Sequence, residues 1–452
     1  VVNYDYYDNG WLENIRQIIS GIEQKFNFVY DNGGRRERLK SFNGASLVTE
    51  TIYGFDNANR LLNLKHLNSL NIELEVLNYL YDPNGNRTNM NRPSVNLPLP
   101  NPASNTSYNS ANQMLSFNDK NIVYDNNGNM MSVTNSCGTT TYTWDVRNRL
   151  VAINGFNADC SLLTASFKYD ALGRRIEKTI NGTTTQYIYD GADIIQEKQN
   201  GVVSANYIRG LNIDEPLARI TSTSIRHYKT DALGSVIALT DETGAIKTQY
   251  VYDPFGNVTV SGESSDNPFQ YAGRENDNTG HLFERNRYYS YELMRYISQD
   301  PIGLAGGDVN YYVRVGNNPV NYTDPLGLWA VKLNFYWGYG GYISFGREGS
   351  KNFVRAGGGV GAGGGIRFYP TGKFPANSEC GPAGFIGASG SIGVAVGPIS
   401  GEIKGETGGL ITRGPDGKPQ VKYIEQGGVQ GSIKGTTGWG LSVGGGLNIV
   451  DM

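Results

Sequence analysis

The feature that most constrains the fold of this chain is a short motif that recurs along its first 328 residues. Each copy is an aromatic residue and an aspartate, followed by a turn that ends in Gly-Asn, Asn-Arg or Gly-Arg, and successive copies mostly start 16 to 27 residues apart. In such a turn the aspartate side chain can accept hydrogen bonds from backbone amides, while glycine supplies a positive φ. The copies are Tyr30-Asp31, Phe55-Asp56, Tyr81-Asp82, Tyr124-Asp125, Trp144-Asp145, Tyr169-Asp170, Tyr189-Asp190 and Tyr252-Asp253.

Each copy predicts a β-hairpin, because residues of alternating character flank the turns, as in 185–189 and 247–252. An isolated hairpin is only marginally stable in water, so we expect the hairpins to pair edge to edge into one long sheet. Two segments interrupt the pattern. Residues 62–80 are rich in leucine and could include a short helix, and residues 92–102 contain prolines that exclude a central strand, which predicts a loop.

The distribution of glycine divides the chain into two parts. Residues 1–328 contain 26 of the 60 glycines, whereas the much shorter segment 329–452 contains the other 34. A composition shift of this size predicts a domain boundary near Leu328.

Composition excludes several classes of function. A net charge of -3 gives no basic field for nucleic acid, and a mean hydropathy of -0.41 without a long apolar run argues against a helical membrane protein. Cys137, Cys160 and Cys380 are too few and too widely spaced for a disulfide framework or a four-ligand zinc site, and with three histidines we expect no metal and no cofactor. No signal peptide is visible, and the chain starts with Val1 inside a patterned segment, so we expect it to be a fragment or a processed piece.

The repeat pattern resembles the tyrosine-aspartate repeats of RHS-repeat proteins, which include bacterial polymorphic toxins, the C subunits of insecticidal toxin complexes and animal teneurins. The resemblance covers most of residues 1–328 and is strongest over 228–328, which looks like the RHS-repeat-associated core. It implies an all-β fold in which the repeats (1–227) and the core (228–328) spiral into a hollow shell, partial at this length. A separate glycine-rich β domain, residues 329–452, would be the enclosed C-terminal cargo. An unrelated β-solenoid or propeller is the alternative for the repeats alone.

Two copies of Asp-Pro-x-Gly-Leu, at Asp300–Leu304 and Asp324–Leu328, carry the candidate chemistry. On turn chemistry alone they predict two tight turns. Their arrangement resembles the self-cleavage module of RHS-repeat toxins, which implies that Asp300 and Asp324 act as an aspartyl-peptidase-like pair. The bond cut would be Leu328–Trp329, which coincides with the glycine boundary. Two close carboxylates cannot both ionise readily, so one could donate a proton while the other activates water.

An arginine is expected to support this pair. The family pattern places Gly-Arg before an aromatic residue, but here Leu293-Met294-Arg295-Tyr296 has the arginine without the glycine. Arg295 and Arg287 are therefore both candidates.

The segment 329–452 does not look like a hydrolytic enzyme, because it contains no histidine, one cysteine and seven acidic residues. Apolar residues instead alternate with small or polar ones, as in Val429–Ile449 and Val354–Phe368. This pattern is typical of a transmembrane β-hairpin and predicts a membrane-active, pore-forming cargo. A soluble one-sided sheet shows the same alternation, and an unrecognised enzyme is the third alternative.

The leading hypothesis is a secreted or cell-surface bacterial toxin-delivery protein whose shell encloses and releases its cargo. Its implied partners are its own cargo, a secretion-system component, an immunity protein and a target membrane, but not nucleic acid. The alternative is a teneurin-like or wall-associated adhesion protein without toxic cargo. A carbohydrate-binding solenoid is a third class, although repeated tyrosines on a sheet more often serve packing.

Overall fold

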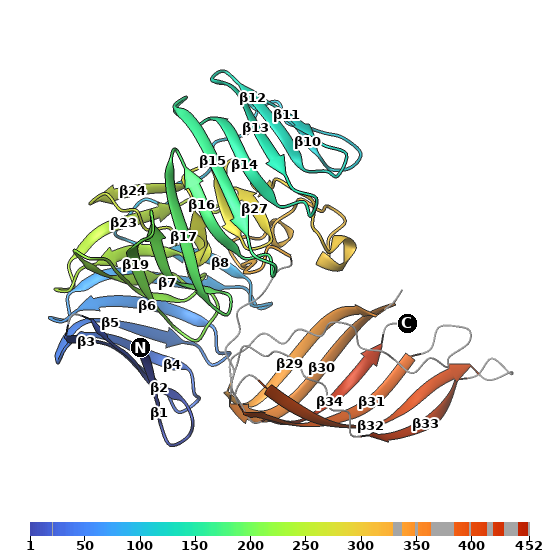
Figure 1. Cartoon of the computed structure of the whole chain (residues 1–452). Coiled ribbons are helices and arrows are strands. Elements are labelled where there is room, and N and C mark those ends of the chain that lie inside the picture. The colour runs from blue at the N-terminus through green and yellow to red at the C-terminus, as the bar shows by residue number, and fades with distance from the viewer. Residues whose placement is uncertain are drawn as a thin grey trace. The chain divides into compact units, whose positions relative to one another are not determined.

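The fold was analysed in a computed structural model, which describes residues 1–19 and 21–328 and six strands between residues 337 and 450. The chain divides into two units. The first comprises Val1–Asp5, Leu12–Val29 and Glu37–Leu333, and the second comprises Tyr6–Trp11, Tyr30–Arg36 and Asn334–Met452. Apart from three short 3-10 turns, every regular element of the described residues is a β-strand, which confirms the all-β prediction (Figure 1). None of the helical turns in the described part of the chain has the length or apolar character needed to cross a bilayer.

The repeats form two meandering sheets in which sequential strands are neighbours. The first has eight strands in the order β1 to β8. They are β1 (Val2–Tyr6), β2 (Leu12–Ile19), β3 (Ile22–Tyr30), β4 (Arg36–Asn43), β5 (Ser46–Phe55), β6 (Leu61–Asn68), β7 (Glu73–Tyr81) and β8 (Arg87–Asn91).

The second sheet has sixteen strands, β9 to β24, again in sequential order. They are β9 (Ser107–Tyr108), β10 (Met114–Phe117), β11 (Lys120–Tyr124), β12 (Met130–Asn135), β13 (Gly138–Trp144), β14 (Leu150–Phe156), β15 (Leu162–Tyr169), β16 (Arg175–Ile180), β17 (Thr183–Asp190), β18 (Asp193–Gln199), β19 (Val202–Arg209), β20 (Pro216–Ile220), β21 (Ile225–Thr230), β22 (Val236–Thr240), β23 (Ile246–Tyr252) and β24 (Val258–Gly262). The predicted single sheet is thus divided in two. The division falls after β8, at the proline-rich loop predicted for residues 92–102.

The repeated motif builds several turns in the same way, at Asp31, Asp56, Asp145 and Asp170, and the Asp56 turn is representative. The carboxylate Oδ1 of Asp56 accepts hydrogen bonds from the backbone N–H groups of Ala58 and Arg60, both at 2.9 Å, as the turn chemistry predicts. Its Oδ2 accepts one from Nε of Arg60 at 2.6 Å. The Arg60 guanidinium then lies over the ring of Tyr81 in the next repeat, and the Tyr81 hydroxyl donates to the Leu61 carbonyl at 2.8 Å. Arg149 and Arg174 lie over Tyr169 and Tyr189 in the same way, so these turns are tied to the next repeat, which explains why an aromatic residue and an aspartate recur together.

Two expectations are corrected. Residues 62–80 form β6 and β7 rather than a helix, because Asn68 replaces the aspartate of the turn: its Oδ1 accepts from the N–H groups of Leu70 and Ile72, both at 3.0 Å. Cys137 and Cys160, whose wide sequence spacing did not suggest a pair, form one disulfide that joins the β12–β13 turn to the β14–β15 turn, with a Cα–Cα distance of 5.1 Å.

Buried polar groups join the two large sheets within the first unit. Arg92 forms an ion pair with Glu75 of the first sheet at 2.5 Å and donates to the Tyr250 carbonyl of the second at 2.7 Å. Lys229 Nζ donates to Thr49 Oγ1 at 2.6 Å. These contacts surround an apolar cluster that draws residues from both sheets: Leu64, Leu77, Tyr79 and Ile237.

A small sheet completes the first unit. It consists of β25 (Glu275–Asn276), β26 (His281–Glu284), β27 (Arg287–Ser290) and β28 (Arg295–Tyr296), in that order. Phe283, Tyr288 and Leu293 pack with the buried face of β10–β15 in the largest apolar cluster. The small sheet therefore packs against the sixteen-stranded sheet.

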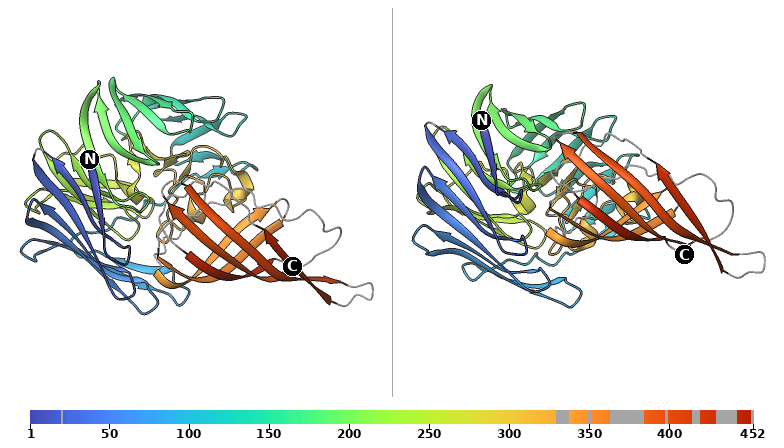
Figure 2. Two further views of the ribbon diagram at one scale, coloured as in Figure 1. Left: turned by 60° about the horizontal axis from the view of Figure 1, so that its bottom comes forward. Right: turned by 90° about the horizontal axis from the view of Figure 1, so that it is seen from below.

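In the second unit, six strands form one antiparallel sheet in the order β29-β30-β34-β31-β32-β33 (Figure 2). They are β29 (Trp337–Glu348), β30 (Lys351–Ala362), β31 (Gly384–Val396), β32 (Ile399–Arg413), β33 (Pro419–Gly428) and β34 (Ser442–Val450). The alternating segment 354–368 thus begins in β30 and 429–449 ends in β34, whereas residues 363–368 and 429–441 lie outside the described residues.

Candidate self-cleavage site

The two Asp-Pro-x-Gly-Leu copies form tight turns, as turn chemistry predicts. Asp300 Oδ1 accepts a hydrogen bond from the Ile302 N–H at 3.0 Å, and the Asp300 carbonyl accepts one from Gly303 at 2.9 Å. In the second copy the Asp324 carbonyl likewise accepts a hydrogen bond from the Gly327 N–H, at 3.3 Å, and Asp324 Oδ1 accepts one from the Leu328 N–H at 3.0 Å. The second aspartate therefore binds the residue on the N-terminal side of the predicted scissile bond.

Arg287 of β27 brings the two aspartates together. Its Nη2 lies 3.0 Å from Asp300 Oδ2 and 3.5 Å from Asp324 Oδ2. All three side chains are buried. The same guanidinium donates from Nε to the Gly327 carbonyl and from Nη1 to the Tyr311 carbonyl, the latter at 3.0 Å. One cation thus orients both carboxylates and holds the backbone just before Leu328.

Gly306 leaves the space between Asp300 and the Leu328 carbonyl open. A Cβ atom at position 306 would lie 2.6 Å from Asp300 Oδ2 and 3.1 Å from the Leu328 carbonyl oxygen. Both oxygens therefore face the same small volume beside Gly306. Trp329, on the other side of the predicted scissile bond, lies outside the described residues.

Asp324 also makes a short contact with Tyr296, which in turn contacts Glu284. The hydroxyl of Tyr296 lies 2.6 Å from Asp324 Oδ2 and 2.5 Å from Glu284 Oε2. Glu284 also forms an ion pair with the buried Arg314 at 2.8 Å. Tyr296, Glu284 and Arg314 therefore link the second aspartate to a buried polar network.

Burial raises the pKa of the Asp300 carboxyl, and the charge of Asp324 raises it further, whereas Arg287 and the Ile302 amide oppose the rise. A pair of carboxyl groups that holds one proton between them can supply both a proton donor and a base. The acid and base roles are therefore assigned to the pair and not to either aspartate.

The structure separates the two arginine candidates. Arg287 contacts both aspartates, whereas Arg295 donates to the Asn112 carbonyl at 2.5 Å and lies over the rings of Tyr108 and Tyr312. Sequence reasoning did not single out Tyr296, Glu284, Arg314 or Gly306. Tyr296, Glu284 and Gly306 lie within six residues of a candidate residue, whereas Arg314 lies ten residues from Asp324 and carries no such signal.

Within the part of the chain that the structure describes, no group of three or more His, Cys, Asp or Glu side chains is placed to hold a metal ion. The arrangement brings together a carboxylate pair, a cation that orients it, and a backbone carbonyl. The carboxylate pair can supply the base and the acid that hydrolysis of a peptide bond uses.

Comparison with known proteins places the fold. The family model described as "Teneurin YD-shell" matches residues 3–305. The tRNA3(Ser)-specific nuclease WapA of Bacillus spizizenii is 32% identical over 374 residues, which cover 75% of this chain and 15% of that protein. The double-stranded DNA deaminase toxin A of Burkholderia cenocepacia is 29% identical, over 49% of this chain and 18% of its own length. The chain therefore spans less than a fifth of these relatives.

Among solved structures, the TcdB2-TccC3 complex resembles the chain with a TM-score of 0.53 and 19% identity, over 72% of this chain and 21% of that one. At this identity the likeness concerns the fold alone.

Proposed function

The chain belongs to the teneurin YD-shell family, and on that premise we propose that residues 1–328 are part of the shell of a secreted or cell-surface bacterial toxin. In this proposal Asp300 and Asp324 cut the chain between Leu328 and Trp329 and release residues 329–452 as the cargo. The observation that carries the proposal is the position of Leu328: Asp324 binds its N–H, and its carbonyl shares the space beside Gly306 with Asp300.

The reaction is hydrolysis. The ionised carboxylate of the pair removes a proton from a water molecule, whose oxygen attacks the Leu328 carbonyl carbon. The protonated carboxyl donates to the departing nitrogen of Trp329, so that a Leu328 carboxylate and a Trp329 amine result. Substrate and catalyst belong to one chain, which gives a high effective concentration and a single turnover.

The test compares Asp300→Asn and Asp324→Asn with Asp308→Asn. Asp308 lies in the same loop and binds the Asn310 N–H at 2.8 Å, but it is not part of the pair. We expect an intact chain of 49.4 kDa in the first two variants and cleavage in the third. Cleavage of both Asp300→Asn and Asp324→Asn at the same bond would contradict the mechanism.

The cargo is proposed to be membrane-active. In support, six antiparallel strands of 9 to 15 residues form one sheet in this segment, and a membrane strand needs about 9 to 11 residues. The fragment 329–452 should release dye from anionic liposomes. In β34, Val443→Asp on the alternating apolar set should abolish release, whereas the neighbouring Ser442→Asp should not. A folded fragment that releases no dye would leave the sheet as a soluble domain.

An adhesion protein without toxic cargo is the alternative. Expression of residues 329–452 in the cytoplasm and in the periplasm of a bacterium separates the two functions: growth arrest in either compartment supports a toxin, and normal growth in both supports adhesion. Two relatives are named as a nuclease and a deaminase toxin, and these names favour the toxin over the adhesion protein. An immunity protein, a secretion-system component and the enclosed cargo itself are the partners that such a toxin requires.

A further inference from the structure

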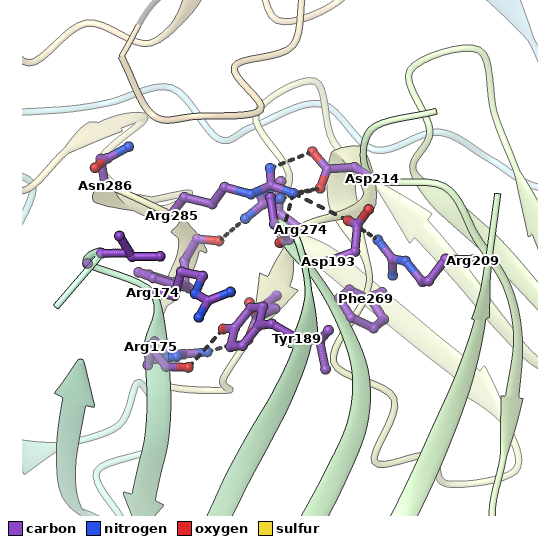
Figure 3. Close-up of a pocket in the computed structure, with 16 residues that line it drawn as sticks. Arg174, Arg175, Tyr189, Asp193, Arg209, Asp214, Phe269, Arg274, Arg285 and Asn286 are labelled. Atoms are coloured by element: carbon purple, nitrogen blue, oxygen red, sulfur yellow. Dashed lines mark hydrogen bonds and ion pairs between the residues drawn. The ribbon is translucent and has the colours of Figure 1, made fainter. Parts of the chain in front are cut away.

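A polar cavity of about 120 Å³ lies in the first unit (Figure 3). This is several times the space that one water molecule needs. The ends of several hairpins and the loops around β25 to β27 form its wall, and five arginines line it: Arg174, Arg175, Arg209, Arg274 and Arg285. Two of its lining residues also hold the Asp324–Leu328 turn: Arg285 donates to the Pro325 carbonyl and Asn286 to the Leu326 carbonyl.

Two of these arginines are paired with carboxylates of their own. Arg174 binds Asp170 at 2.7 Å. Arg175 binds Glu275 at 2.5 Å as well as Asp277, and Lys178 also binds Asp277, at 2.8 Å, so that two cations face two carboxylates. These pairs contribute little net charge to the cavity.

The other three arginines share only two carboxylates. Arg209 lies 3.0 Å from Asp193, and Arg285 lies 2.9 Å from Asp214 and 3.5 Å from Asp193. Arg274 forms its ion pair with Asp214 as well. All three guanidinium groups are largely buried. The cluster therefore carries one positive charge more than it can neutralise, and an uncompensated buried charge is costly.

Unused hydrogen-bond donors accompany this charge. Nε and Nη1 of Arg209, whose side chain is only 7% exposed, have no acceptor among the described residues, and neither has Nε of Arg274 or Arg285. Buried donors are nearly always paired, so unpaired ones on a cavity wall indicate a missing acceptor. Figure 3 shows Arg209 and Arg285 on either side of Asp193, with the ion pairs of the cluster drawn.

We propose that this cavity binds a small oxyanion, a phosphate group or a carboxylate, with Arg209 as the principal ligand and Arg274 and Arg285 supplying the remaining charge. An anion there would neutralise the excess charge and accept the unused hydrogen bonds, and guanidinium groups are well suited to both tasks. Asp193 competes with the anion for Arg209 and Arg285. The site does not depend on the proposed self-cleavage.

The probe is inorganic phosphate, which is titrated into the full chain at constant ionic strength while the heat of binding is measured. A parallel titration with acetate tests for a carboxylate ligand, and one with chloride is the control. We expect saturable phosphate or acetate binding and an increase in the thermal unfolding temperature that chloride does not produce. The anion that binds more tightly identifies the source of the oxyanion.

Two variants shift the binding in opposite directions. Arg209→Gln should abolish it, and Asp193→Asn, which removes the competing carboxylate, should tighten it on the order of tenfold. The matched control is Arg226→Gln, which breaks a pair with Glu263 outside the cavity and should leave binding unchanged. If Arg209→Gln does not fold, Asp193→Asn still decides the question. An absence of saturable binding with either phosphate or acetate, or unchanged affinity in Asp193→Asn, overturns the proposal and leaves a cavity filled by water only.

Discussion

The backbone N–H of Leu328 donates to Asp324 Oδ1 at 3.0 Å, so the second aspartate holds the residue whose carbonyl is proposed to be attacked by water that the aspartate pair activates. The relationship follows from the sequence spacing, because both residues belong to one Asp-Pro-x-Gly-Leu turn. It places catalyst and substrate four residues apart in the same turn, and the predictions for Gly306 and Arg287 depend on this geometry.

Gly306→Ala should block cleavage without unfolding the chain. The added Cβ would lie 2.6 Å from Asp300 Oδ2 and 3.1 Å from the Leu328 carbonyl oxygen, where the attacking water has to enter. Gly306 does not have a positive φ, so alanine fits its backbone conformation. Cleavage is followed on a gel and folding by circular dichroism, with the exposed neighbour Ala305→Ser as control. Wild-type cleavage in Gly306→Ala would show that this space is not the site of attack.

Arg287→Gln should slow cleavage and move the acidic limb of its rate–pH profile to higher pH. The Arg287 charge opposes the rise in the pKa of Asp300 that burial causes, so its removal raises that pKa further and a higher pH is needed to ionise the pair. The measurement is the rate of self-cleavage after refolding from denaturant, as a function of pH. A loss of cleavage rate at every pH, without a shift of the acidic limb, would indicate misfolding and would argue against a role of Arg287 in setting the pKa of Asp300.

Tyr81→Phe should destabilise the first unit by about 1 kcal/mol, the typical net value of one hydrogen bond. The Tyr81 hydroxyl donates to the Leu61 carbonyl of the preceding repeat at 2.8 Å, and the phenylalanine ring would leave that carbonyl without this donor. Denaturant unfolding measures the change. Tyr6→Phe, at a half-exposed tyrosine, is the control and should have almost no effect. Equal stability of both variants would mean that the repeated tyrosine acts by packing alone.

The first unit should lose stability as the pH falls below about 6.5. Burial, together with the charge of Lys229, lowers the pKa of His66 and His227 to about 3. The unfolded chain therefore binds more protons than the folded chain between about pH 3 and 6.5, and unfolding is favoured by up to about 1.4 kcal/mol per pH unit for each histidine. Burial also lowers the pKa of Lys229 to about 7. As the pH falls from about 10.4, the pKa of a lysine in the unfolded chain, to about 7, the unfolded chain binds a proton that the folded chain does not, so the folded state loses stability here too.

His227→Leu separates this effect from general acid unfolding. His227 is fully buried, and neither ring nitrogen has a hydrogen-bond partner among the described residues, so leucine should be tolerated. The slope of unfolding free energy against pH, measured between pH 4 and 6.5, should fall by about one proton. An unchanged slope would contradict the assignment to His227.

The repeats could be predicted from sequence because each hairpin is encoded by a local turn. The prediction was wrong at residues 62–80, where Asn68 builds the same turn without an aspartate and the leucine spacing suggested a helix. At the site, the two aspartates and Arg287 were among the candidates because they belong to or lie near the motif. Arg314 and Tyr296 were not, because their contacts with Glu284 and Asp324 join segments 28 to 30 residues apart that only the folded core brings together.

The most direct test is the intact mass and N-terminal residue of the fragments formed when the purified full chain refolds. The account predicts one break, with Leu328 as the new C-terminus and Trp329 as the new N-terminus, and a single chain of 49.4 kDa in Asp300→Asn and Asp324→Asn. A refolded wild-type chain that stays intact, or a break at any other bond, would contradict it.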